Sequence, residues 1–336
     1  MNQKAKYSII CAVIVLGTMA AFYWRVTWHL MPGQSFKGPL PGLSSEESAW
    51  RDFLSGHLDV LANQIGERNS KKYSALQKAA DYITQQFKKL GYEPKFQEFD
   101  VDGQKYKNIE VELPGSDPDL AKVIVGAHYD SAIDSPGAND NASGVACLLE
   151  LARALHGKSN ARTIKIVALT NGEAPFQSTP NSGSYHYAQL AKSANAKIKG
   201  MLSLDEIGYY TDSPNSEKLP VNVFSYYPAE GNFVMVVADP QSANLCRSTV
   251  GEFRAHAKFP MEGIICQTST NPQGMIGADH CQFWKAGYPA VMLTDTGSDR
   301  YPNVHSQLDN LSQIDTDKLS RVVGGLTSVV SSLANN

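Results

Sequence analysis

A histidine and an aspartate are placed where they could bind a metal ion. His128 follows an apolar run at 123–125, which predicts a buried strand, and Asp140 precedes a segment with the apolar period of a helix. Ligands of open α/β sheets bind outside the carboxyl ends of strands, so His128 and Asp140 are candidate zinc ligands. Asp130 is placed to orient the imidazole of His128. These residues alone leave open a surface histidine beside an aspartate that caps the helix.

Three more residues of ligand type follow other predicted elements. Glu173 comes after a strand expected at 163–170, Asp205 after one expected at 199–204, and His305 in the last long loop. Five imidazole and carboxylate groups from separate loops suit two divalent ions that share one carboxylate. Such a pair of ions clamps the attacking and the leaving atoms of a hydrolysis at once.

The order of the predicted elements indicates the fold class. Strands alternate with helices along the chain, which argues for an α/β fold with a mostly parallel, twisted central sheet and helices on both faces. The remaining strands are expected at 94–101, 105–113, 221–226 and 288–293, and helices are expected at 74–90, 241–257 and 316–333.

Composition and charge describe a globular protein without a basic surface. Of the 336 residues, 42% are apolar and 19% are charged, which fits a chain with a full core. The net charge of −3 gives no indication of nucleic-acid binding.

The N-terminal region contains an uncharged stretch of the length of a membrane span. Residues 7–24 carry no charge, which predicts a transmembrane anchor that follows a cytoplasmic tail at 1–6. A linker at 25–44 would then lead to a catalytic domain at 45–336, in the periplasm or outside the cell. A cleaved signal peptide is the alternative.

Several motifs, taken in order, resemble a known family. The sequence is similar to the co-catalytic di-zinc aminopeptidases of the secreted bacterial leucine aminopeptidase type, which are related to glutaminyl cyclases. The resemblance covers about residues 70–335 and implies a zinc exopeptidase-like fold, two zinc ions per chain and removal of N-terminal residues from peptides. The motifs are His-Tyr-Asp-Ser at 128–131, Gly-Ala-Asn-Asp-Asn-Ala-Ser-Gly at 137–144, Leu-Asp-x-Ile-Gly at 204–208, Asp-His at 279–280 and the late His305.

The resemblance implies a role for each candidate ligand. His128 and Asp205 would bind one zinc ion, Glu173 and His305 would bind the other, and Asp140 would bridge the two.

The resemblance also covers residues around the ligands. Asp279 and His280 match a pair near the substrate cleft, although polar residues of a surface loop are an equal alternative. Asp309 matches an acidic position of the last loop. Glu206 stands where the family usually has methionine, and strand alternation predicts that its side chain points away from that of Asp205.

One position departs from the family pattern. The family has two adjacent glutamates, a general base followed by a ligand, and this chain has Gly172-Glu173. Aligned without gaps, Glu173 is the ligand and the base is missing; in the other register Glu173 is the base and Ala174 leaves one zinc short of a ligand. A general base contributes about 10²–10⁴-fold to a rate. Glu206 and Asp279 are candidates for a replacement.

Three functions are therefore considered. The first is a membrane-anchored, exported zinc aminopeptidase that acts on peptides; its oligomeric state is left open. The second is a zinc-binding pseudopeptidase. Activity restored by Gly172→Glu would support it, by indicating that only the general base was lost. A transferase like the glutaminyl cyclases ranks last, because those relatives lack the first histidine of the pattern and this chain has His128.

Overall fold

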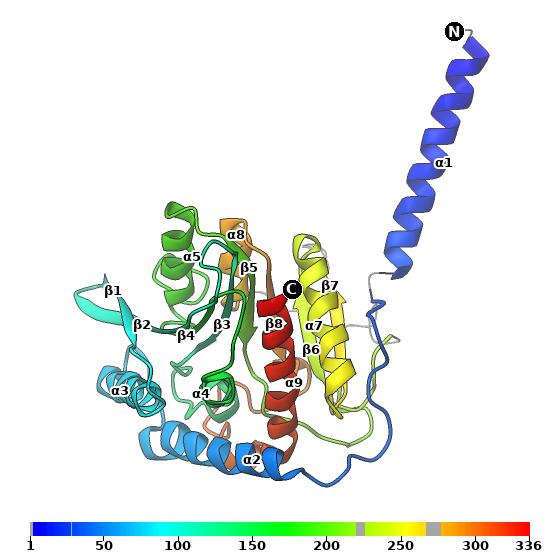
Figure 1. Ribbon diagram of the computed structural model, residues 1–336. Helices are drawn as coiled ribbons and strands as arrows, with labels where there is room; N and C mark the ends of the chain where they lie inside the picture. Colours follow the sequence, from blue (N-terminus) through cyan, green and yellow to red (C-terminus); the bar gives the residue numbers. More distant parts are fainter. Residues whose placement is uncertain (1–2, 28, 220–225, 267–276) are drawn as a thin grey trace.

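The computed structural model describes residues 3–27, 29–219, 226–266 and 277–336. Within them the chain forms one sheet of eight strands in the order β1-β2-β4-β3-β5-β8-β6-β7 (Figure 1). The strands are β1 (Lys95–Val101), β2 (Gln104–Leu113), β3 (Lys122–His128), β4 (Ile164–Leu169), β5 (Ile198–Leu204), β6 (Val234–Ala238), β7 (Met261–Ile265) and β8 (Ala290–Thr294).

The centre of the sheet is parallel and its edges are mixed. β3 runs parallel to β4 and β5, and β5 runs parallel to β8. At the edges, β1 with β2, β2 with β4, and β6 with β8 pair antiparallel, whereas β6 and β7 are parallel. The α/β architecture is as predicted. The parallel centre brings the carboxyl ends of β3, β4, β5 and β8 to one edge.

Helices cover both faces of the sheet (Figure 1). On one face α4 and α9 pack side by side, α7 packs against α9, and α2 crosses outside them; α5 and α8 pack together on the other face. The helices are α1 (Gln3–Thr27), α2 (Ser45–Leu58), α3 (Tyr73–Lys89), α4 (Gly144–Leu155), α5 (Gly183–Ser193), α7 (Ala243–His256), α8 (His280–Ala286) and α9 (Thr316–Asn335).

The apolar run of β3 is continuous because both of its faces are buried. Val123 and Val125 belong to the main core, which also contains Leu148 of α4. Ile124 points to the opposite side, into a smaller core with Tyr187 of α5. Burial of one such aliphatic side chain contributes about 1.5–3 kcal/mol, so both layers hold β3, and the histidine at its end, in place.

The N-terminal prediction is contradicted. α1 extends away from the sheet (Figure 1), but no helix in the described part of the chain is both long and apolar enough to cross a membrane. The predicted transmembrane anchor at 7–24, and with it the single-pass membrane protein, is therefore wrong, whereas export of the catalytic domain stays a prediction. The uncharged run has only about the minimum length for a crossing, and it includes Gly17 and Thr18. The other predicted domain boundaries stay predictions.

Three elements of the second half were not anticipated from the sequence. β6 and β7 have five residues each and are largely buried, and α8 has seven. β7 contains Glu262 and Gly263, which interrupt its apolar pattern. The strand predicted at 221–226 falls, as far as residue 225, outside the described residues.

Candidate metal centre

The predicted ligands lie at the carboxyl ends of the parallel strands. His128 is the last residue of β3, Asp205 follows β5, and Glu173 lies in the segment after β4. Asp140 lies in the turn η2 (Ala138–Ser143) before α4, where its own backbone angles are not helical, and His305 lies in the loop after β8. Because parallel strands end at the same edge, the five side chains come from separate segments to one place.

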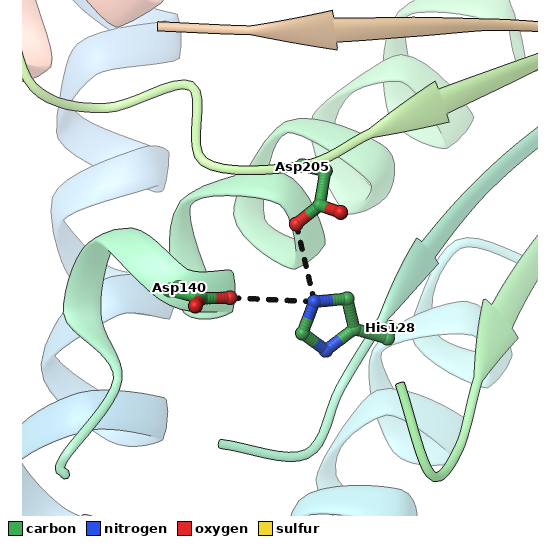
Figure 2. A group of neighbouring side chains, drawn as sticks. All are labelled: His128, Asp140 and Asp205. Carbon is green, nitrogen blue, oxygen red and sulfur yellow. Dashed lines mark hydrogen bonds and ion pairs between the residues drawn. The ribbon is translucent and has the colours of Figure 1, made fainter. Parts of the chain in front are cut away.

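Three of these side chains form a tight, buried group (Figure 2). The Nε2 atom of His128 is 3.1 Å from Oδ1 of Asp205 and 3.3 Å from Oδ1 of Asp140. All three side chains are buried. Ligand atoms of a tetrahedral zinc ion, with bonds of about 2.0–2.1 Å, lie roughly 3.3 Å apart, so the observed spacing fits zinc.

The other oxygen of Asp140 faces a second group. Its Oδ2 lies 2.9 Å from Nε2 of His305, and the same nitrogen lies 3.5 Å from Oε2 of Glu173. Oε1 of Glu173 is buried and has no hydrogen-bond partner among the described residues. Asp140 thus presents one oxygen to each histidine, which is what a carboxylate that bridges two ions requires.

The electrostatics of the site favour a cation. Burial would lower the pKa of His128, but Asp205, Asp130 and Asp140 raise it well above its ordinary value. Burial raises the pKa of Asp205 and, together with the charge of Asp140, that of Glu173. Crowded, buried carboxylates are stabilised by a positive ion between them, so these residues fit a divalent metal.

Asp130 holds the loop that carries Glu173. Its two oxygens accept the backbone N–H groups of Gly172 at 2.8 Å and of Glu173 at 3.0 Å. Its Oδ1 is 3.6 Å from Nδ1 of His128, which is too long for a hydrogen bond. The structure therefore places Asp130 beside His128, and its orienting role stays a prediction.

Asp309 fixes the turn that presents Asp140. Its Oδ1 accepts the N–H of Asn139 at 2.7 Å, and its Oδ2 accepts that of Asp140 at 3.1 Å. The hydroxyl of Tyr301 donates to the same carboxylate at 3.1 Å. Burial raises the pKa of Asp309 to about 6. The bridging residue is thus held through its own backbone.

The five predicted ligands line one cavity of about 270 Å³. Four of them are buried, whereas the side chain of His305 is 51% exposed. The other lining residues are Gln177, Glu206, Ala278, Met292, Ser298 and Val304.

Asp279 and His280 lie behind the wall of this cavity at the start of α8. Both are buried, which excludes the surface loop considered as an alternative. Burial raises the pKa of Asp279 to about 7 and lowers that of His280 to about 3. The ring of His280 packs edge-on against Trp284. Neither residue is part of the lining, so their contact with substrate stays a prediction.

Glu206 shares the cavity with Asp205, contrary to the prediction. Alternation of side chains holds within a strand, but β5 ends at Leu204, before both residues. Glu206 has a φ of +51°, and its side chain joins Asp140 and His305 in a second group of ligand atoms. The signal in the sequence was a carboxylate where the related family has methionine.

Because Gly172 has no side chain, there is room beside it for the side chain of His128. A Cβ atom built on Gly172 would lie 2.3 Å from Cγ and 2.5 Å from Cβ of His128. Carbon atoms in van der Waals contact are about 3.5–4.0 Å apart, so another residue at 172 would displace the histidine or the loop. The glycine is therefore part of how this chain positions His128.

Comparison with known proteins identifies the family. The family model of Peptidase family M28 matches residues 108–330, which is more than half of the chain. The chain belongs to peptidase family M28. Uncharacterized protein YfbL of Escherichia coli strain K12 is 31% identical over 341 residues, which cover 98% of each protein. A probable zinc metalloprotease of Pyrenophora tritici-repentis is 30% identical over 207 residues, and the match covers 56% of this chain and 41% of that protein.

Solved structures show the same fold. A zinc aminopeptidase from Bacillus subtilis, BSAP, has a TM-score of 0.67 at 15% identity and covers 85% of this chain and 95% of its own. The glutaminyl cyclase of Fimbriiglobus ruber has a TM-score of 0.61 at 20% identity and covers 88% of this chain and 97% of its own. The resemblance to di-zinc aminopeptidases and glutaminyl cyclases is thus confirmed.

Membership in family M28 supports a zinc-dependent metallopeptidase of aminopeptidase type. All five predicted ligands lie within the matched residues 108–330, as do Gly172 and Glu206. The ligand roles of individual residues are not settled by membership, so they enter the proposal below.

Proposed function

We propose that this member of family M28 is an aminopeptidase that holds two zinc ions and removes residues from the free N-terminus of peptides. One observation carries the proposal: the two oxygens of Asp140 face two different histidines, His128 and His305. His128 and Asp205 would hold one ion, His305 and Glu173 would hold the other, and Asp140 would contact both.

The metal and the protein residues would have different roles in the reaction. Zinc, when bound, polarises a carbonyl oxygen and lowers the pKa of a coordinated water to about 7. Asp309 keeps Asp140 in place, and Asp130 keeps the loop of Glu173 beside His128. Because Gly172 carries no carboxylate, we expect turnover to be lower, by about 10²–10⁴-fold, than in a relative that has a general base there.

The lining of the cavity favours an amine over a carboxylate as the group recognised. Asp140, Glu173, Asp205 and Glu206 line it, and the described lining residues include no Lys or Arg. Two zinc ions would offset these four carboxylates, so the lining offers no cationic side chain to hold the C-terminal carboxylate of a peptide.

Hydrolysis of blocked and unblocked substrates tests this proposal. The zinc-loaded full chain is expected to hydrolyse leucine p-nitroanilide and to leave N-acetyl-leucine p-nitroanilide intact, because the acetyl group removes the free N-terminal amine that an aminopeptidase requires. A chelator should abolish the activity, and added zinc should restore it. Equal hydrolysis of the acetylated compound would contradict an aminopeptidase.

A catalytically silent metal-binding protein is a second candidate, and the packing of Gly172 against His128 favours it. A side chain at 172 would overlap that of His128, and this supports a site that works without a glutamate there. Zinc binding without hydrolysis of any peptide or arylamide would support this candidate. A peptide with N-terminal glutamine, added to the same sample, tests for cyclisation.

A further inference from the structure

Glu206 lies beside the second of the two proposed metal positions. One oxygen of Glu206, one of Asp140 and a ring nitrogen of His305 all lie within 4.8 Å of one another. The family pattern that pointed to the other ligands assigns no role to this position, where it usually has methionine.

Hydrogen bonds fix the backbone of Glu206 on both sides. Its N–H donates to Oδ1 of Asn141 at 3.3 Å, and its carbonyl oxygen accepts the N–H of Asp295 at 2.5 Å. The φ of +51° is uncommon for a residue with a side chain. The surrounding structure thus holds Glu206 in a conformation that places it in the wall of the cavity.

Gly297 leaves room for the carboxylate. A Cβ atom at this position would lie 1.9 Å from Oε2 of Glu206, so a side chain there would push the carboxylate away. Gly297 and His305 belong to the same segment after β8. The segment after β8 therefore both supplies His305 and leaves room for the carboxylate of Glu206.

The cavity is lined by four carboxylates and two imidazoles, and Glu206 is the only one of these carboxylates that is not fully buried. Four carboxylates line it without a Lys or Arg among the described lining residues: Asp140, Glu173, Asp205 and Glu206. Oε1 of Glu173 is buried, has no hydrogen-bond partner in the described chain, and belongs to a side chain that lines this cavity. Buried carboxylates of this kind are unfavourable unless a cation pairs with them.

We propose that Glu206 is a further ligand of the metal ion held by His305 and Glu173, next to the bridging Asp140. This inference rests on the proposed function, because it assumes a second metal position. Three carboxylates and one imidazole form a donor set rich in oxygen, and such sets suit Mn²⁺ as well as Zn²⁺. We therefore expect the second position to accept either ion.

The glutamate at 206 also offsets the glycine at 172. The family pattern has a carboxylate at the position of Gly172 and a methionine at that of Glu206. This chain has a carboxylate at 206 and none at 172, so the number of carboxylates around the two proposed ions is the same as in the family pattern. The two departures from the pattern are thus explained as one rearrangement of charge.

Calorimetric titration of the metal-free full chain with Zn²⁺, and separately with Mn²⁺, tests this inference. We expect the wild type to bind metal in two events. In Glu206→Met and Glu206→Gln, one of these events should have an affinity about 10–100-fold weaker than in the wild type. His305→Ala identifies which event belongs to the second position. Glu98→Gln, on the exposed part of β1, is the matched control and should bind like the wild type.

The same variants show whether they are folded. Without metal, Glu206→Met should melt at the same temperature as the wild type or higher, because the substitution removes a partly buried carboxylate from among other carboxylates. Wild-type affinity for both ions in Glu206→Met would overturn the inference, even if turnover fell, since Glu206 would then act on substrate. A wild-type chain that binds no metal would instead overturn the proposed function.

Discussion

Replacing Gly172 by alanine is expected to reduce turnover by at least about 10²-fold, and replacing it by glutamate is not expected to restore a base. The new Cβ would lie 2.3 Å from Cγ of His128. The ring that must move carries the Nε2 atom that faces Asp140 and Asp205. A shift of about 1 Å in a catalytic group costs about 10²-fold in rate. Zinc content and arylamide turnover, measured in one sample, check this expectation.

Gly56→Ala is the control for this experiment. Gly56 lies in α2, and a Cβ atom there would meet nothing within 4 Å, so this variant should keep wild-type zinc content and turnover. A gain of turnover in Gly172→Glu would contradict the account. It would show that the loop absorbs the new side chain and that only a base had been lost.

Asp140→Asn is expected to disrupt both metal positions at once. Each carboxylate oxygen of Asp140 faces one histidine, and asparagine would present an NH₂ group to one of them. We expect zinc content to fall from about two ions per chain to below one, with turnover at background. Mass spectrometry of the dialysed protein measures the zinc, and arylamide hydrolysis measures the turnover.

Asp119→Asn makes the same chemical change at an exposed position and should leave both quantities unchanged. Asp205→Asn distinguishes the bridge from an ordinary ligand, because it touches only the group around His128. We expect this variant to keep about one zinc ion. Equal zinc loss in Asp205→Asn and Asp140→Asn would argue against a bridging role for Asp140.

The meeting of the candidate ligands could be predicted because their signals in the sequence are local. A continuous apolar run ended by His128, and an aspartate directly before an apolar-periodic helix, both survive in the structure as β3 and the start of α4. Parallel strands then bring separate loops to one edge by geometry alone. The meeting of His128, Asp140 and Asp205 in one group follows from these few features.

Predictions failed where local rules end or where length was the only criterion. The alternation rule was applied to Glu206, although β5 stops at Leu204 and the backbone then turns with a positive φ. The fit between Gly172 and His128 depends on a contact between two strand ends, which spacing in the sequence does not reveal. The uncharged run at 7–24 was taken as a membrane span from its length, and the finding on α1 contradicts this.

Anomalous X-ray scattering from zinc-loaded crystals, measured at the zinc absorption edge, tests the two-metal site most directly. We expect two peaks on either side of the Asp140 carboxylate, one next to His128 and Asp205 and the other next to His305 and Glu173. No peak at this edge of the sheet, or zinc bound only elsewhere, would contradict the two-metal site on which the proposed function depends.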